Sequence, residues 1–178
     1  AKIALFTMGN PGLSDEEKAG LMQSYRTYAQ LADDSEAIPN RYLLATTGLS
    51  ASGKTCVSAA MAQQLNLIRL RSDVERKRLH GLAPLANSKS GLGTDLYSAE
   101  ATRKTYQALA DRAGQLLASG QSVIIDAACL KHEERTLFAE VAESQGVPFL
   151  LLHCEAPENL RRQWIRERKG DASEATEE

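Results

Sequence analysis

The run Gly48-Leu49-Ser50-Ala51-Ser52-Gly53-Lys54-Thr55 limits the possible folds of this chain more than any other segment, because it fits the pattern G-x-x-x-x-G-K-[ST] in full. Glycines in this pattern let successive backbone N–H groups surround a phosphate at the positive end of the following helix. We expect Lys54 to reach the β- and γ-phosphates of a nucleotide and Thr55 to bind Mg²⁺. The alternative, a glycine turn with an incidental lysine, is less favoured. The predicted nucleotide contacts are Gly48, Ser50, Ala51, Ser52, Gly53, Lys54, Thr55 and Cys56.

The segments around this loop predict strands that alternate with helices. Strand-like apolar segments are expected at 41–47, 67–71, 122–126 and 147–153, and helices after the loop and over 98–120, 132–145 and 157–169. Repeated strand–helix units with buried apolar strands indicate a parallel sheet with helices on both faces. We therefore predict a three-layer α/β P-loop fold. Ligands of such sheets bind beyond the carboxyl ends of the strands, where Gly48, Asp73, Asp126 and Cys154 are expected.

Residues 1–40 and 41–178 are expected to form separate parts of the chain. Ser14 and Glu17 form a capping box for an amphipathic helix over 14–33, and a polar connector ending near Pro39 follows it. The second part has a suitable length for one domain with a proper core. Both ends of the sequence look cut, so we expect it to be a fragment of a longer polypeptide.

Composition argues against two classes of partner. The net charge of −2 and the pI near 6.0 disfavour a surface that coats DNA or membranes. The three cysteines are scattered, which is typical of reduced thiols rather than of a disulfide framework. No apolar run approaches the ~20 residues of a membrane span, and no signal peptide is visible. A soluble, cytoplasmic protein is the expectation.

Asp73 and Arg76 lie three residues apart at the end of the second predicted strand, in the run Arg71-Ser72-Asp73-Val74-Glu75-Arg76. On the first turn of a helix they share one face. Asp73 could accept a proton from an attacking hydroxyl, while Arg76 holds an anionic group of the acceptor. The alternative makes Asp73 a helix cap and Arg76 a solvated charge.

Asp126 ends an apolar strand, the usual position of the Mg²⁺ carboxylate in phosphate-loop proteins. Its alternative role is that of a turn residue. Farther along, Arg162, Arg166 and Lys169 form a basic helical face, which could stabilise charge on a transferring phosphoryl group. A solvated amphipathic helix remains equally open for any single arginine.

The stretch from Gly48 to Leu79, with Tyr97-Ser98-Ala99-Glu100-Ala101-Thr102 and Val123-Ile124-Ile125-Asp126-Ala127, resembles the AAA-type small P-loop kinases. That group includes zeta toxins, gluconate kinase, adenylylsulfate kinase and polynucleotide 5′-kinases. The chain is most similar to the carboxyl-terminal ATP-binding domain of bacterial two-domain proteins whose amino-terminal half resembles aminoglycoside phosphotransferases. Such domains show an S-D-x-x-R-K-x-L segment, here from Ser72, and an arginine-rich helix before G-D-A-S, here from Gly170.

This resemblance implies roles for particular residues. Asp73 would be the general base, Arg76 the contact to the acceptor's phosphate or other anion, and Arg166 or Arg168 the lid arginine. Residues 1–40 would be a helical linker from a missing amino-terminal domain. Residues 41–178 would be the kinase domain, without the last helix and strand that cover adenine in such kinases.

The sequence therefore predicts an ATP-dependent kinase that uses Mg·ATP and a hydroxyl of a small-molecule or nucleotide-like acceptor. Residues 83–96 and 169–178 are expected to be the least ordered and to close over the ligands. One alternative is a regulatory ATP-binding module that controls a fused partner domain. Another is a nucleic-acid 5′-hydroxyl kinase, which the neutral charge and few aromatic residues disfavour.

Overall fold

The computed structural model describes residues 2–36, 41–84 and 95–167, and its chain divides into two compact units, Ala1–Asn40 and Arg41–Glu178. In the first unit, α1 (Lys2–Met8) packs against α2 (Asp15–Glu36). The capping box forms as expected, because the Glu17 carboxylate accepts from the Ser14 N–H at 2.8 Å and Ser14 Oγ accepts from the Glu17 N–H at 3.3 Å. These bonds fix the start of α2.

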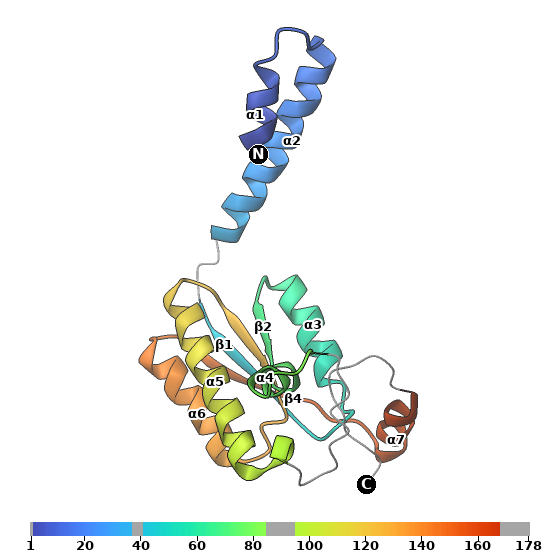
Figure 1. Cartoon of the computed structure of the whole chain (residues 1–178), viewed down its shortest axis with the longest axis vertical. Helices are drawn as coiled ribbons and strands as arrows, with labels where there is room; N and C mark the ends of the chain where they lie inside the picture. The colour runs from blue at the N-terminus through green and yellow to red at the C-terminus, as the bar shows by residue number, and fades with distance from the viewer. Residues whose placement is uncertain (1, 37–40, 85–94, 168–178) are drawn as a thin grey trace. The chain divides into compact units, whose positions relative to one another are not determined.

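The second unit is built on four parallel strands (Figure 1), in the order β2-β3-β1-β4. They are β1 (Leu43–Thr47), β2 (Ile68–Arg71), β3 (Val123–Asp126) and β4 (Phe149–His153). β1 lies between β3 and β4 in the sheet, and β2 pairs with β3. The predicted parallel α/β fold is confirmed, and each predicted strand is found within about two residues of its expected bounds.

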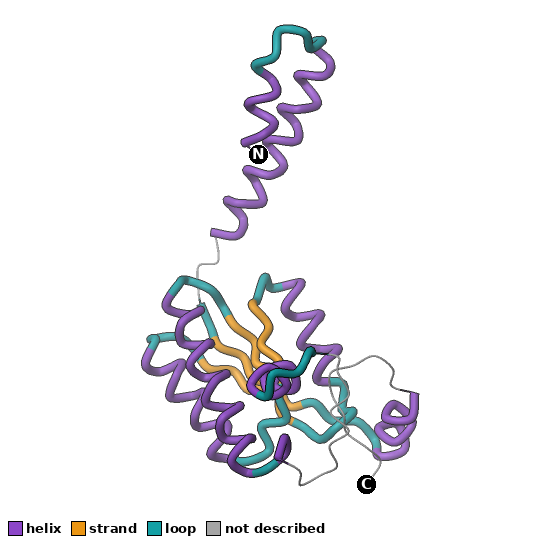
Figure 2. The backbone as a smooth tube through the Cα atoms, in the orientation of Figure 1, coloured by secondary structure: helices purple, strands orange, loops and turns teal. Residues whose placement is uncertain are grey.

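Helices cover both faces of this sheet (Figure 2). The helices α5 (Ala99–Ala118) and α6 (His132–Ser144) pack on one face, while α3 (Lys54–Gln64) lies on the other. The side chains of β1 alternate accordingly: Leu43 and Ala45 join the core under α5 and α6, and Leu44 joins the smaller core under α3. The central strands β1 and β3 are buried on both faces, which explains the apolar residues of Leu43–Ala45 and Val123–Ile125.

Three short elements complete the unit. The helix α4 (Ser72–Leu79) follows β2 directly, a 3₁₀ helix (Asp95–Tyr97) precedes α5, and α7 (Glu158–Glu167) follows β4. Ser98 caps α5 as predicted, because its Oγ accepts from the Ala101 N–H at 3.1 Å. Residues 85–94 and 168–178, which cover most of the two segments expected to close over the ligands, lie outside the described residues.

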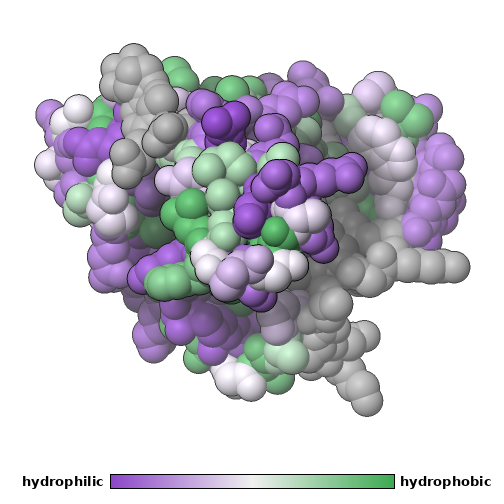
Figure 3. Space-filling view, turned by 90° about the horizontal axis from the view of Figure 1, so that it is seen from above, coloured by the Kyte–Doolittle hydropathy of each residue, from purple (hydrophilic) through white to green (hydrophobic). Residues whose placement is uncertain are grey.

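In the part of the chain that the structure describes, no helix is long and apolar enough to cross a membrane. Hydrophilic residues are interspersed among hydrophobic ones on the face drawn in Figure 3.

Candidate functional site

The phosphate loop connects the carboxyl end of β1 to the first residue of α3. Its backbone leaves the ordinary conformations at three positions, with φ of 142° at Gly48, 57° at Ala51 and 90° at Gly53. Gly53 is the amino-terminal cap residue of α3, and Lys54 is the first residue of that helix. The loop therefore ends in a left-handed turn at the amino terminus of α3, the positive end of that helix. The predicted loop-to-helix geometry is therefore present.

Gly48 has no space for a side chain. A Cβ atom there would lie 2.2 Å from the Cys154 carbonyl oxygen and 2.9 Å from Ser52 Oγ. The Gly48 N–H donates to the Ala128 carbonyl at 3.0 Å, and the Cys154 N–H donates to the Thr47 carbonyl at 2.8 Å. The loop thus starts in a narrow passage between the segments that follow β3 and β4, which only glycine can enter.

Two side chains inside the loop have the arrangement that a phosphate ligand requires. Ser52 is buried, and its Oγ has no hydrogen-bond partner among the described residues. The Lys54 ammonium group folds back over the loop and donates to the carbonyls of Gly48 at 2.9 Å and Leu49 at 2.6 Å. A buried, unsatisfied hydroxyl is unfavourable by itself and becomes satisfied when an acceptor such as a phosphate oxygen enters the loop.

Residues that the sequence analysis did not select support this loop from behind. The Thr47 hydroxyl donates to the Cys129 carbonyl at 3.0 Å, and Arg135 at the start of α6 donates to the same carbonyl at 2.9 Å and to that of Leu130 at 2.6 Å. Cys129 has φ of 41°, and its N–H donates to the Tyr106 hydroxyl at 3.1 Å. Burial raises the pKa of the Cys129 thiol to about 12. This thiol is therefore a packing group and stays protonated.

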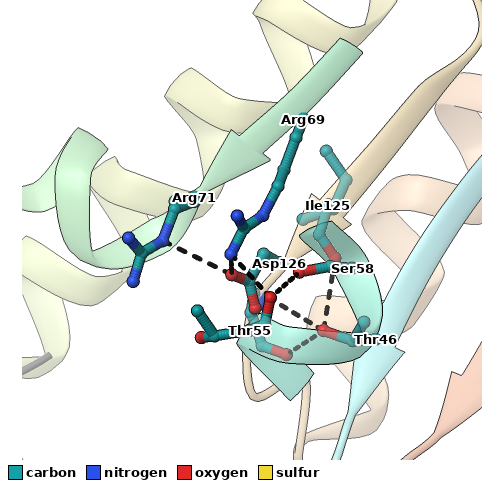
Figure 4. Close-up of polar contacts among 8 residues, drawn as sticks. Thr46, Thr55, Ser58, Arg69, Arg71, Ile125 and Asp126 are labelled. Carbon is teal, nitrogen blue, oxygen red and sulfur yellow. Dashed lines mark hydrogen bonds and ion pairs between the residues drawn. The ribbon is translucent and has the colours of Figure 1, made fainter. Parts of the chain in front are cut away.

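Asp126 lies at the carboxyl end of β3, where the sequence predicted it, but two arginines already contact its carboxylate (Figure 4). Arg69 Nη2 is 2.6 Å from Asp126 Oδ2, and Arg71 Nε is 3.4 Å from the same oxygen. Arg69 Nη2 also donates to the backbone carbonyl of Thr55 at 3.0 Å. One guanidinium group therefore connects the two residues predicted to bind the metal.

Arg69 and Arg71 were missed because their strand was interpreted only through its apolar positions. In register, Arg71 pairs with Asp126 and Arg69 with Ile124, so both arginines lie on the α3 face of the sheet. The sequence did contain a signal for them: Arg69 and Arg71 are two positions apart in a short predicted strand, so they lie on one face of it, close to the phosphate loop.

Asp73 and Arg76 have different surroundings on α4. Asp73 is half-buried on the first turn, whereas Arg76 is only 7% exposed. Arg76 Nη1 donates to the Leu96 carbonyl and to Thr102 Oγ1, both at 3.1 Å, and the guanidinium group lies 5.1 Å from the centre of the Tyr97 ring. Arg76 Nε is buried without a hydrogen-bond partner among the described residues. Arg76 thus connects α4 to the 3₁₀ helix and to α5.

The next residues of α4 are also buried charges. Glu75 is 4% exposed and contacts Arg78 at 2.6 Å and Arg112 at 3.3 Å. Lys77 is 2% exposed. Charged residues are rarely buried, so three consecutive buried charges on α4 are unusual. They show that α4 packs against the rest of the unit instead of facing solvent.

The predicted lid arginines are only partly described. Arg166 is exposed near the end of α7, and Arg168 lies outside the described residues. Arg162 on the same helix pairs with Glu158, with Nη2 2.7 Å from Oε1. Since all described residues of α7 are at least partly exposed, this helix has little packing to hold it in one place.

Comparison with known proteins identifies the family. A model of the AAA domain matches residues 43–178. The chain belongs to the AAA domain family. No curated protein sequence matches it significantly. The match to the AAA domain model confirms, at the level of the family, the resemblance stated from the sequence.

Solved structures agree on the fold. A candidate kinase from Chloroflexus aurantiacus is 22% identical, with a TM-score of 0.59 over 72% of this chain and 67% of that one. The APS kinase of Mycobacterium tuberculosis, solved with AMPPNP and APS, is 23% identical, with a TM-score of 0.54 over 70% and 69%. A sugar kinase from Janibacter is 20% identical, with a TM-score of 0.53 over 78% and 73%. This family member therefore has the P-loop kinase fold.

Proposed function

We propose that this protein is an ATP-dependent phosphotransferase that moves the γ-phosphoryl group of ATP to a hydroxyl of a small-molecule or nucleotide-like acceptor. The observation that carries the proposal is the complete phosphate loop, with the buried and unsatisfied Ser52 hydroxyl inside it and the Lys54 ammonium group above it. The kinase fold of the structural neighbours supports transfer rather than binding alone.

The loop is the nucleotide side of the proposed site. Amides of the loop, with the side chains of Ser52 and Lys54, would hold the phosphates of ATP. Lys54 would exchange its contacts to the Gly48 and Leu49 carbonyls for contacts to the β- and γ-phosphates, which are charged and therefore stronger. Ser50, Ala51, Thr55 and Cys56 complete the predicted contacts.

The donor set at this site fits Mg²⁺ that arrives with a nucleotide. Thr55 and Asp126 offer hard oxygen ligands, which Mg²⁺ prefers, and it usually keeps substrate phosphates and waters as its other ligands. Among the described residues, no group of three or more His, Cys, Asp or Glu side chains could hold a metal ion. When bound, the ion would neutralise charge on the phosphates.

Asp73 is the proposed general base. Its carboxylate would take the proton of the acceptor hydroxyl while the hydroxyl oxygen forms a bond to the γ-phosphorus and the bond to ADP breaks. Its position on the first turn of α4, directly after β2 and beyond the carboxyl end of a strand as the phosphate loop is, supports this role. Arg76 was predicted to hold the acceptor's anionic group. Because it is buried, it would contribute by keeping α4 in position.

Arg166 or Arg168 would supply positive charge at the transferring group when the α7 region closes. The limited packing of α7 supports such a movement.

The setting of the enzyme is also part of this proposal. All three cysteines are free thiols, which supports a reducing, cytoplasmic compartment. A fused amino-terminal domain similar to aminoglycoside phosphotransferases would be a covalent partner, and residues 1–40 would link it to the kinase domain. A membrane partner is not part of the proposal, and nucleic acid is not the favoured acceptor.

Acceptor-dependent release of ADP tests the proposal. The protein is incubated with Mg·ATP and a panel of alcohols that includes sugars, sugar acids, nucleosides and nucleotides, with the Lys54→Ala variant as the control for contaminating kinases. Transfer to at least one acceptor by the parent protein, and to none by the variant, is the expected result. Tight binding of Mg·ATP without transfer to any acceptor would favour a regulatory ATP-binding module instead.

A further inference from the structure

Arg69 on β2 contacts two residues that are far apart in the sequence, and it does so through a single nitrogen atom. Its Nη2 lies 2.6 Å from Oδ2 of Asp126 and 3.0 Å from the backbone carbonyl oxygen of Thr55. Asp126 is the last residue of β3, and Thr55 is the second residue of α3. Figure 4 shows the Arg69 side chain extending from β2 toward Asp126. One guanidinium group thus joins a strand end to the first turn of the helix that follows the phosphate loop.

The strand register explains why Arg69 reaches Asp126. β2 is parallel to β3, and Arg69 pairs with Ile124, whose side chain lies in the core under α3. Side chains two positions apart on a strand point to the same face, so Asp126 also lies on the α3 face of the sheet. The carboxylate, the guanidinium group and the first turn of α3 therefore meet on one face.

Stability alone does not account for this buried ion pair. The side chain of Asp126 is 5% exposed and that of Arg69 is 20% exposed, and Arg69 Nε is buried without a hydrogen-bond partner among the described residues. An unsatisfied buried donor is unfavourable, and apolar side chains can often replace a buried ion pair without loss of stability. An arginine held in this way beside a phosphate loop points to a role in the site.

The two oxygens of the Asp126 carboxylate have different surroundings. Arg69 Nη2 and Arg71 Nε both contact Oδ2, at 2.6 Å and 3.4 Å. Within the part of the chain that the structure describes, no hydrogen bond or ion pair ends on Oδ1. A carboxylate that is fixed through one oxygen can offer the other to a metal ion or to a water bound to it, and such supporting contacts orient metal ligands.

On the helix side, Arg69 contacts the backbone of Thr55. The same carbonyl oxygen accepts a hydrogen bond from Ser58 Oγ at 3.2 Å, and Ser58 is fully buried. These contacts hold the first turn of α3, which carries the Thr55 hydroxyl. The two oxygen donors predicted for Mg²⁺, on Thr55 and Asp126, are therefore held relative to each other by one nitrogen of Arg69.

We propose that Arg69 is a positioning residue for Mg²⁺: it holds Asp126 Oδ2 and the first turn of α3 so that Asp126 Oδ1 and the Thr55 hydroxyl keep the separation at which they bind the ion. This inference rests on the proposed function, because the ion arrives with ATP. Arg69 would itself touch neither the nucleotide nor the ion.

The first test measures the affinity for AMP-PNP by calorimetry, once with Mg²⁺ and once with EDTA. The ratio of the two dissociation constants gives the contribution of the ion. In Arg69→Met this contribution should shrink by about 10–100-fold, the range for loss of a contact that orients a metal ligand. The affinity in EDTA should stay close to that of the parent. Arg103→Met, which removes an exposed arginine of α5, is the matched control and should behave like the parent in both solutions.

Two results of this test would overturn the proposal. One is an unchanged contribution of Mg²⁺ in Arg69→Met. The other is an equal loss of affinity with and without the ion, which would make Arg69 a support of the whole phosphate loop. Arg69→Lys keeps a charged donor at this position and should show a smaller loss of the Mg²⁺ contribution, which keeps the test valid if Arg69→Met folds poorly.

A double-mutant cycle tests whether Arg69 acts through Asp126. Asp126→Asn should by itself remove most of the contribution of Mg²⁺, and adding Arg69→Met should then change that contribution little. Additive losses in the double variant would mean that Arg69 acts by another route and would overturn the proposal.

The outcomes also separate this inference from the kinase proposal. Acceptor-dependent transfer by the parent, with a Mg²⁺ contribution that does not depend on Arg69, would refute the role of Arg69 and leave the kinase proposal standing. A Mg²⁺ contribution that depends on Arg69, without transfer to any acceptor, would support the role of Arg69 and count against the kinase proposal.

Discussion

The phosphate loop and the charged segment Arg69–Arg78 lie at the same edge of one sheet but are built from different parts of the chain. The loop depends on backbone: glycine at a position without space for a Cβ, left-handed turns, and carbonyls that hold Lys54. The charged segment depends on side chains, with Glu75, Arg76 and Lys77 all buried. A site made of backbone is defined by local sequence, whereas a site made of buried charges is defined by the partners that the fold brings to it.

The largest effect is expected at the loop. Lys54→Ala removes the charged side chain of the phosphate loop, so Mg·AMP-PNP affinity should fall by about 10²–10⁴-fold, the sum of two charged contacts. Titration calorimetry measures the loss, and circular dichroism should show an unchanged fold. Lys104→Ala on α5, where the lysine pairs with the exposed Glu100, is the control and should bind normally. An unchanged affinity in Lys54→Ala would mean that the loop does not bind nucleotide phosphates.

The second effect is a loss of phosphoryl transfer with nucleotide binding unchanged. Asp73→Asn keeps the size of the side chain on the first turn of α4 but removes the carboxylate that takes the proton. Transfer should fall by about 10²–10⁴-fold, while nucleotide affinity changes little. Single-turnover kinetics and nucleotide titration measure the two quantities separately. Transfer at the parental rate would refute the role of Asp73 as the general base.

A smaller effect tests whether Arg76 on α4 stabilises the fold or contacts the acceptor. Arg76→Met removes two hydrogen bonds and the contact with the Tyr97 ring, and it leaves the Leu96 carbonyl without its donor. The free energy of unfolding should fall by about 1–3 kcal/mol in denaturant titrations. Arg103→Met should show no comparable loss, because surface substitutions usually change little. If Arg76→Met instead kept its stability and raised only the KM for the acceptor, Arg76 would be the acceptor contact predicted from the sequence.

The smallest effect is expected for Cys56, a residue of the loop region that is predicted to contribute to nucleotide binding mainly through its backbone. Cys56→Ser exchanges an exposed thiol for a hydroxyl on the first turn of α3. Mg·AMP-PNP affinity should stay within about 5-fold of the parent, the size of one neutral hydrogen bond. A change beyond that range would show that the thiol itself contributes to nucleotide binding, against the distinction drawn between the two regions.

Much of the site's nucleotide side could be predicted from the sequence. The pattern from Gly48 to Thr55 predicted the loop and the start of α3, since both depend on neighbours within a few residues. The contacts of Lys54 with the Gly48 and Leu49 carbonyls were not predicted. Apolar segments alternating with helical ones likewise predicted the four parallel strands. The physical reason is clearest for β1 and β3, which are buried on both faces.

The sequence by itself therefore determined the sheet, the phosphate loop and the placement of Asp73 and Asp126 at one edge. Only the tertiary structure decided the partners of the charged side chains: Arg69 and Arg71 on Asp126, and Arg76 against Leu96 and Thr102. The pairing of β2 with β3 brings Arg69 to a carboxylate 57 positions away along the chain. The interactions of a charged side chain depend on which groups lie within a few ångströms of it. Strand order and helix packing determine those groups, not neighbours in the sequence.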